Sequence, residues 1–151
     1  MLKKILYKMT KEEKELLLRD LCARLPYGVK AVVIEEGEYK YKKGIIESIG
    51  TPFEPLVPPH DDVLLHFFDK NSILGNPKTD VICFSTYEIK PFLRPMESMT
   101  KDEHEEYQIY VDCLTDTGIS FLNDWLLAHH FDYRGLIERG LAIEAPEGMY
   151  E

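Results

Sequence analysis

Residues Asp80–Pro95, DVICFSTYEIKPFLRP, mark the point at which the chain changes from predicted strands to predicted helices. The run Val81–Phe84 is rich in β-branched and aromatic residues, which favour a buried strand. The stretch Lys90–Pro95 contains two prolines, and proline interrupts both helices and central strands. We therefore predict that Val81–Phe84 is the last strand of a small sheet and that Lys90–Pro95 leads into a helical C-terminal part.

The chain before this stretch has the pattern of one helix followed by short strands. Thr10-Lys11-Glu12-Glu13 is a capping box, in which a hydroxyl and a carboxylate bind each other's backbone amides. Leucines then recur at helical spacing as far as Leu25, with Asp20 and Arg24 on the other side of the helix, and the following proline ends it. The predicted strands are Val29–Glu35, Tyr39–Lys42, Ile45–Ile49 and Val63–Phe68.

The chain after Pro95 is predicted to be mainly helical. A second capping box, Thr100-Lys101-Asp102-Glu103, opens an acidic helix that Thr117-Gly118 ends. The remaining predicted elements are a helix with Phe121, Leu122, Trp125, Leu126 and His129 on one face, a short helix at Tyr133–Arg139 that Asp132 caps, and a terminal strand within Leu141–Ala145.

Together these elements predict an α+β fold. An N-terminal helix precedes a small, curved antiparallel sheet of four or five strands, for which a barrel of the Src-homology-3 kind is one possible form, and two or three helices follow. Residues 1–95 would supply the helix and the sheet core, and residues 96–151 a helical part packed on the same domain. The length of 151 residues fits one domain.

The charge of the chain is acidic and unevenly placed. The net charge is −9; residues 1–43 hold eleven Lys/Arg against seven Asp/Glu, whereas residues 44–151 hold seven against twenty. An acidic surface repels phosphate groups, so nucleic-acid binding by the whole protein is disfavoured. Two interpretations stay open, namely a solvated surface that aids solubility and an acidic face that docks on a basic partner.

The cysteines and the lack of long apolar runs bear on the cellular compartment. Cys22, Cys83 and Cys113 lie far apart, and their odd number argues against a disulfide framework and for a reducing cytoplasm. The apolar patch near the N-terminus is too short for a signal peptide, and the run Val63–Phe68 is far below membrane-spanning length. We therefore expect a cytoplasmic protein with no membrane partner.

One short region contains a candidate metal site. His60, Asp61, Asp62 and His66 bring together two imidazoles and two carboxylates, which are ligands that zinc and other divalent metals use. Their spacing matches no standard metal motif, because a proline-rich loop runs into a strand. A metal-dependent hydrolase that uses these residues is therefore an alternative hypothesis for the function.

No other motif points to catalysis. A P-loop, a nucleophile elbow and a dinucleotide fingerprint are all absent from the sequence, so neither catalytic residues nor a cofactor is predicted. His129 and His130, with Asp132, form a second cluster of possible ligands. Adjacent side chains on a helix point in different directions, which favours one buried and one exposed histidine.

The segment Tyr39–Lys42 alternates tyrosine and lysine. This alternation is typical of an exposed edge strand, on which lysines discourage pairing with another sheet. Tyrosines that stack on bases and lysines that contact phosphates would produce the same pattern. Weak nucleic-acid binding through Lys40, Lys42, Lys43 and the lysines near the N-terminus is therefore a second alternative.

Three segments of the chain carry a resemblance: MTKEEKELLLRDLCARLPYGVK, IKPFLRPMESMTKDEHEEY and NDWLLAHHFDYRGLIERGLAIEAPEGMY. Together they resemble a group of small uncharacterised proteins of gut anaerobic bacteria and of their phages and mobile elements. The third segment is the most specific part of the match. The group has no established activity, so the resemblance implies a biological setting and no mechanism or site residues.

The leading hypothesis for the function is a non-enzymatic accessory module that binds a protein partner. The loops Gly50–Asp62 and Asp69–Thr79 are the predicted recognition segments, because long loops without secondary structure are often functional. The acidic helix that starts at Lys101 is a further feature suited to binding a partner.

Overall fold

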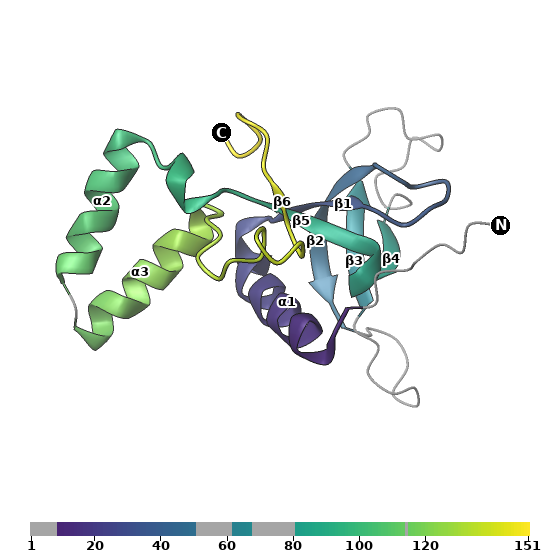
Figure 1. Cartoon of the computed structure of the whole chain (residues 1–151), viewed down its shortest axis with the longest axis horizontal. Coiled ribbons are helices and arrows are strands. Elements are labelled where there is room, and N and C mark those ends of the chain that lie inside the picture. Colours follow the sequence, from purple (N-terminus) through teal and green to yellow (C-terminus); the bar gives the residue numbers. More distant parts are fainter. Residues whose placement is uncertain (1–8, 51–61, 68–80, 114) are drawn as a thin grey trace.

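The computed structural model describes residues 9–50, 62–67, 81–113 and 115–151. The chain has the predicted α+β class, with an N-terminal helix, a sheet, and then C-terminal helices (Figure 1). The α-helices are α1 (Lys11–Arg24), α2 (Lys101–Asp112) and α3 (Asp116–Ala128), with short 3-10 turns η1 (Leu25–Tyr27), η2 (Thr86–Glu88) and η3 (Met96–Ser98). The strands are β1 (Lys30–Val33), β2 (Lys43–Ile49), β3 (Asp62–Phe67), β4 (Val81–Ser85), β5 (Ile89–Leu93) and β6 (Ile143–Glu144).

Helix α1 begins at the predicted capping box and covers one face of the sheet. The Thr10 hydroxyl accepts the Glu13 amide at 3.2 Å, and the Glu13 carboxylate accepts the Thr10 amide at 2.9 Å. These bonds satisfy two of the amides that a helix start leaves without partners. Leu17 and Leu21 are fully buried against apolar side chains of the strands, so the main core lies between α1 and the sheet. On the side of the sheet this core includes Val29, directly before β1, and the strand residues Ala31, Val33, Ile46, Val63, Leu65, Phe84, Ile89 and Leu93.

The sheet is open and mixed. Its strand order is β4-β3-β2-β1-β5-β6, and every neighbouring pair is antiparallel except β5 and β6, which are parallel. The prediction of a purely antiparallel sheet is therefore wrong for its last strand, and the sheet does not close into a barrel. Closure would need β4 to pair with β6, and a strand of only two residues offers too few backbone groups for that pairing.

The prediction that Lys90–Pro95 only leads from the sheet into the helices is wrong, because β5 runs through Pro91 and lies between β1 and β6. The Ile34 amide donates to the Glu88 carbonyl at 2.8 Å, and the same register places Ala31 opposite Pro91. Hydrogen-bonded and non-hydrogen-bonded pairs alternate along antiparallel strands, so the proline nitrogen points away from β1. On its other side, β5 begins to pair with β6 one residue later. The missing N–H therefore removes no ladder hydrogen bond.

The segment Tyr39–Lys42 is a turn between β1 and β2, and not the predicted edge strand. Tyr41 has a φ of 68°, and the Lys42 amide donates to the Tyr39 carbonyl at 3.0 Å, which closes a turn. The Tyr39 ring packs edge-on against Phe84 at 6.0 Å, whereas Tyr41 is 71% exposed. The two tyrosines therefore do not share one face.

The short helix predicted at Tyr133–Arg139 is a succession of turns. The Asp132 carboxylate accepts the amides of Leu136 at 2.8 Å and Ile137 at 2.9 Å, four and five residues further on. A helix N-cap bonds amides two or three residues away, so this geometry ties down a wider loop. The predicted terminal strand exists as the short β6.

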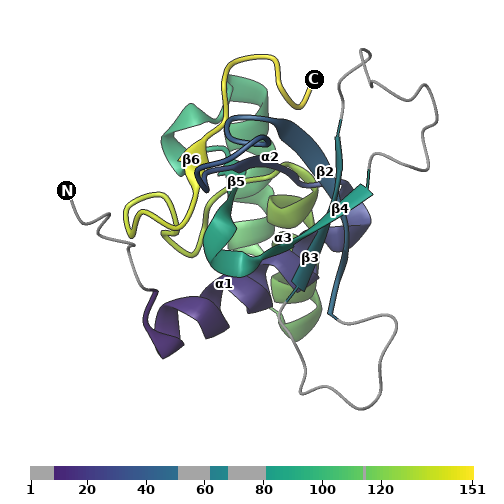
Figure 2. The same ribbon diagram turned by 90° about the vertical axis from the view of Figure 1, so that its right-hand side faces the viewer.

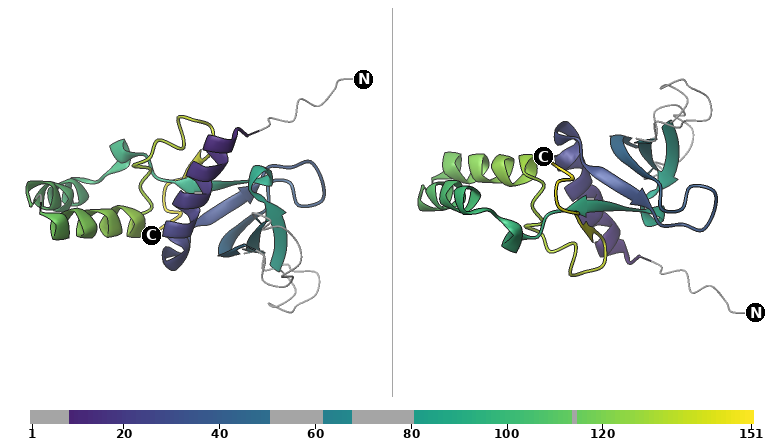
Figure 3. Two further views of the ribbon diagram at one scale, coloured as in Figure 1. Left: turned by 90° about the horizontal axis from the view of Figure 1, so that it is seen from below. Right: turned by 90° about the horizontal axis from the view of Figure 1, so that it is seen from above.

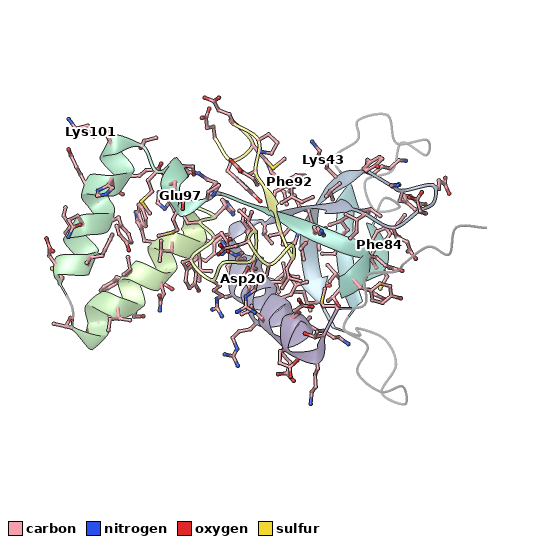
Figure 4. The ribbon with its side chains drawn as sticks, viewed as in Figure 1. Asp20, Lys43, Phe84, Phe92, Glu97 and Lys101 are labelled. Atoms are coloured by element: carbon pink, nitrogen blue, oxygen red, sulfur yellow. The ribbon has the colours of Figure 1, made fainter. Side chains whose placement is uncertain are left out.

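A charged pair lies at the centre of the molecule, which corrects the prediction that Asp20 and Arg24 face away from the packed side of α1. Both side chains are fully buried, and the Arg24 guanidinium bonds the Asp20 carboxylate at 2.7 and 3.2 Å. Arg24 also donates to the Phe131 carbonyl at 2.7 Å, and Arg134 approaches Asp20 to 3.4 Å. The loop after α3 therefore covers a second side of α1, near Asp20 in Figure 4.

We expect the substitution Asp20→Leu to lower the free energy of unfolding by about 3–5 kcal/mol, because it leaves the buried Arg24 charge without its carboxylate. The double variant Asp20→Leu, Arg24→Met contains no buried charge at this place and should lose less stability than the single variant. Urea unfolding of the two variants and the native chain measures the difference. A double variant less stable than Asp20→Leu would contradict the assigned role of the pair.

Candidate protein-binding surface

Helices α2 and α3 form a hairpin that projects away from the sheet and from α1 (Figures 1 and 3). As predicted, α2 starts at a capping box, in which the Thr100 hydroxyl accepts the Glu103 amide at 3.2 Å and the Glu103 carboxylate accepts the Thr100 amide at 3.0 Å. At the start of α3, the Thr115 hydroxyl accepts the Gly118 amide at 3.1 Å. Both helix starts are thus defined by residues close in sequence.

Gly118 lies inside α3 near the tip of the hairpin, and the prediction that it ends a helix is wrong. A Cβ atom at this position would lie 1.9 Å from the Cys113 carbonyl oxygen, far closer than atoms in contact can approach. Gly118 is buried, and the absence of a side chain lets α3 begin directly beside the end of α2. The sharp turn of the hairpin therefore depends on this glycine.

The hairpin has a small core of its own around Trp125. The indole packs against Phe131 at 5.6 Å and against Tyr107 and Tyr110 at 6.2 Å each. Its N–H donates to the Glu106 carboxylate at 2.8 Å, which joins α3 to α2. The other residues around this core are Leu126, Met96, Met99, Leu122 and Tyr133.

Arg94, directly after β5, attaches the hairpin to the body of the molecule. Its guanidinium donates to both oxygens of Glu103 at 2.7 Å each and lies 4.3 Å from the centre of the Phe131 ring. The hydrogen bonds from Arg94 lower the pKa of Glu103 from 4.5 to about 2, with a further contribution from the Thr100 amide, against the opposing effect of burial. The Glu103 carboxylate thus fixes the first turn of α2 and its connection to the sheet.

The outer surface of the hairpin is strongly acidic. Residues 101–130 contain seven Asp/Glu and one lysine. Asp102, Glu105 and Asp124 are exposed, and no Lys or Arg in the described part of the chain forms an ion pair with them. The negative charge of the C-terminal part, which the sequence predicted, is therefore presented in large part on one projecting element.

Exposed apolar side chains lie near the tip of the same hairpin. Ile109, three residues before the end of α2, is 62% exposed; Ile119 and Phe121, in the first two turns of α3, are 47% and 57% exposed. They are three of the five large apolar or aromatic residues that are exposed among the described residues. Single exposed apolar residues are ordinary, but several on one projecting element are typical of a binding surface.

The candidate metal ligands lie partly outside the described residues. His60 and Asp61 are among the residues that the structure does not describe, and Asp62 and His66 lie on β3, four residues apart. At the rise of a strand, four residues separate two Cα atoms by about 13 Å. No group of three metal-ligating side chains occurs among the residues described. The metal-dependent hydrolase stays a prediction.

The predicted recognition loops lie almost wholly outside the described residues, as do the lysines within residues 1–8, whereas the other lysines predicted to contact nucleic acid are described. Of the loop Gly50–Asp62 only the first and last residues are described, and the loop Asp69–Thr79 lies entirely outside the described residues. Lys40 pairs with Glu36, and the ammonium of Lys42 lies 5.3 Å from the centre of the Tyr39 ring. The ammonium of Lys43 lies 5.4 Å from the centre of the Phe92 ring. These lysines contact the protein itself, and binding to nucleic acid stays a prediction.

The two adjacent histidines differ in burial, but the prediction of one buried and one exposed histidine on a helix is confirmed only for His130, because both follow the end of α3 and His129 is not exposed. His130 is buried and His129 half-buried, and the His130 ring stacks on Tyr150 with centres 3.6 Å apart. Burial lowers the pKa of His130 from 6.5 to about 4, and the nearby charges of Arg24, Lys30, Arg94 and His129 act in the same direction. His130 is therefore neutral at physiological pH.

Tyr150 fastens the C-terminal tail between two strands. Its hydroxyl accepts the Lys30 amide at 2.9 Å and donates to the Phe92 carbonyl at 2.7 Å. The register of β1 and β5 places Lys30 opposite Phe92, so the hydroxyl replaces a direct backbone hydrogen bond where the strands separate. Burial raises the pKa of Tyr150 to about 12, so the hydroxyl keeps its proton.

No family model, curated protein or solved structure matches this chain. None of the helices in the described ranges has both the length and the apolar character that crossing a bilayer requires. The candidate surface is therefore defined by the geometry and charge of the hairpin alone.

Sequence reasoning anticipated the acidic helix but missed the exposed apolar residues. It placed Phe121 and Trp125 on one face of a helix, and the structure buries Trp125 but exposes Phe121. An apolar stripe at i, i+1, i+4 and i+5 is wider than the face that one neighbouring helix covers. The width of this stripe could have indicated that part of it stays exposed, because α2 covers only the side of α3 that carries Leu122 and Trp125.

We expect Gly118→Ala to destabilise the protein, although replacing glycine by alanine inside a helix ordinarily stabilises it by roughly 0.5–1 kcal/mol. The added methyl group would collide with the backbone oxygen of Cys113. Thermal unfolding measures the effect, and Ser120→Ala, at an exposed position two residues further on, is the matched control. A higher melting temperature for Gly118→Ala would contradict the close approach at the tip.

The free energy of unfolding should decrease as the pH is lowered, in an upper pH range set by His130 and a lower pH range set by Glu103. The folded pKa of His130 is depressed, so the unfolded chain binds this proton more readily and stability falls as the pH drops from 6.5 towards 4. The folded pKa of Glu103 is also depressed, so its contribution is complete above 4.5 and is lost towards 2. Urea unfolding at a series of pH values measures both effects.

Two variants distinguish the effects of the two residues. His130→Asn should remove the loss of stability in the upper pH range only, because asparagine does not titrate and tolerates the positive φ of 61° at this position. Glu103→Gln should remove the loss of stability in the lower pH range only. A variant that changes the other range instead would show that the assignment is wrong.

Proposed function

We propose that this protein is a non-enzymatic accessory module that binds a basic protein partner through the α2–α3 hairpin. The single observation that carries the proposal is the combination, on one projecting element, of dense negative charge with exposed Ile109, Ile119 and Phe121. The sequence had left open whether the acidity is only a solvated surface. The proposal selects the docking interpretation.

The hairpin is built to present a surface without changing shape. Its own core around Trp125 holds the two helices together, and the Arg94–Glu103 bonds attach the start of α2 to the end of the sheet. A preformed surface loses little conformational freedom on binding, which favours affinity. Rigidity of this kind supports a recognition role for the hairpin.

The chemistry of the surface indicates the chemistry of the partner. Carboxylates and exposed apolar residues on the same hairpin complement a partner that carries both Lys/Arg and apolar side chains, such as a basic amphipathic helix. The charges would steer the encounter and the apolar residues, Phe121 above all, would supply buried area. A phosphate-rich or acidic partner is repelled by the same surface.

The proposal is tested with a synthetic amphipathic peptide of lysine and leucine, whose binding is followed by fluorescence anisotropy. We expect the triple variant Asp102→Asn, Glu105→Gln, Asp124→Asn to bind about tenfold more weakly, because three exposed charges at about 0.5 kcal/mol each amount to about 1.5 kcal/mol. Phe121→Ser should also weaken binding while leaving its salt dependence unchanged.

The matched control is Glu35→Gln, Glu38→Gln, Glu147→Gln, which removes three exposed charges outside the hairpin. This variant has the same net charge as the first triple variant and should bind within about twofold of the native chain. Equal loss in both triple variants would show that only net charge matters and would refute the hairpin as the binding surface.

The biological setting of the module follows from the resemblance alone. Three segments resemble proteins of gut anaerobic bacteria, their phages and mobile elements, and we propose an accessory role in such an element. The loops Gly50–Asp62 and Asp69–Thr79 remain proposed as further recognition segments.

A further inference from the structure

The side chains of Arg24 and His130 each carry a buried nitrogen that has no hydrogen-bond partner in the described part of the chain. Arg24 is fully buried and His130 is 8% exposed, and the two atoms are Nη1 of Arg24 and Nδ1 of His130. A buried polar atom that stays unpaired destabilises the folded state, most of all on a charged group. A ligand that pairs both atoms would remove this cost.

The two side chains are neighbours in space. Arg24 Nη2 donates at 2.7 Å to the carbonyl of Phe131, the residue that follows His130. Burial has the largest effect on the lowered pKa of His130, and the Arg24 charge has the largest effect among the nearby charges. Both nitrogens therefore lie in one region, between the last turn of α1 and the residues that follow α3.

The charged groups that act on His130 are all cationic or able to become so. They come from α1, from β1, from the residue after β5 and from the end of α3, and they are Arg24, Lys30, Arg94 and His129. The charge of Arg94 is matched by Glu103, and Lys30 donates to the Met149 carbonyl. The surroundings of the two nitrogens are thus suited to a negatively charged ligand.

The carboxylates of this region are bonded to other groups. Asp20 accepts Nε and Nη2 of Arg24, and Arg134 approaches the same carboxylate to 3.4 Å, so that two guanidinium groups share it. The Asp132 carboxylate accepts two backbone amides. An additional anion would give Arg24 a second negative partner.

We propose that Arg24 Nη1 and His130 Nδ1 together bind one small inorganic anion, of the size of chloride. The guanidinium donates from every nitrogen, and a neutral histidine donates from Nδ1 in one of its two tautomers. Both atoms can therefore point a proton at the same anion. The class of ligand follows from this pair of donors and from the positive charge around them.

Tyr150 covers one side of the proposed site. Its ring stacks on His130 with centres 3.6 Å apart, and its hydroxyl bonds to β1 and β5. Burial raises the pKa of Tyr150 to about 12, and the Arg24 charge acts in the opposite direction, so the guanidinium lies near this ring as well. Figure 2 shows the C-terminal tail, in yellow after β6, on the side of the sheet opposite α1. The enclosure by α1, the residues after α3 and the tail limits the ligand to a small one.

NMR of the full chain tests the proposal through the pKa and the tautomer of His130. The chain is titrated in sodium chloride and in sodium gluconate at one ionic strength, because gluconate is too large for an enclosed site. We expect chloride to raise the pKa of His130 from about 4 by about 1 or more, since a nearby anion favours the protonated ring. Chloride should also favour the tautomer that is protonated at Nδ1.

The double variant Asp20→Leu, Arg24→Met removes the guanidinium, and chloride should leave the pKa of its His130 unchanged. Arg19→Gln, at an exposed arginine of the same helix, is the matched control and should keep the full effect of chloride. An equal pKa of His130 in the two salts, or an effect of chloride that persists in the double variant, would overturn the proposal.

A diffraction measurement on the native chain keeps the test valid if the double variant fails to fold. Bromide replaces chloride in a soaked crystal and is located by its anomalous scattering. We expect a bromide peak within hydrogen-bonding distance of Arg24 Nη1 and His130 Nδ1. A water molecule without anomalous signal between these atoms, or bromide at other places only, would refute the anion site.

Discussion

The buried pair of Asp20 and Arg24 is the constraint on which the arrangement of the other elements depends. A guanidinium with no exposure is tolerated only where carboxylate and carbonyl oxygens surround it. Asp20 supplies the carboxylate from the same helix, and the Phe131 carbonyl supplies a partner from a residue 107 positions away in the chain. The loop after α3 must therefore lie on α1, and this places the C-terminal end of α3 at the edge of the main core.

Phe131 connects the buried pair to the hairpin. Its carbonyl binds Arg24, while its fully buried ring packs on Trp125 and beneath the Arg94 guanidinium. Arg94 in turn holds Glu103 at the start of α2. The hairpin can project from the body and still be rigid, because one buried residue and one bidentate ion pair connect its base to the sheet.

The parts of the fold that could be predicted are those set by residues close in sequence. Both capping boxes need only a threonine and a glutamate three residues apart, and both occur as predicted. The presence of Pro91 in a strand and the burial of Arg24 depend instead on tertiary context. Proline is acceptable in β5 because of its place in the hydrogen-bond alternation, and Arg24 is buried because a distant loop provides oxygens. Neither condition is visible in the local sequence.

For the same reason, the acidity of the candidate surface could be predicted from the sequence, and its exposed apolar residues could not. Charge is a property of composition, so the acidity of residues 101–130 could be seen in the sequence. The exposure of Phe121 could not, because it depends on how much of α3 the single neighbouring helix covers. A polar surface alone would be a solvated one. Apolar residues left uncovered within it have a cost in water that contact with a partner would remove, and this cost is the physical argument for recognition at the hairpin.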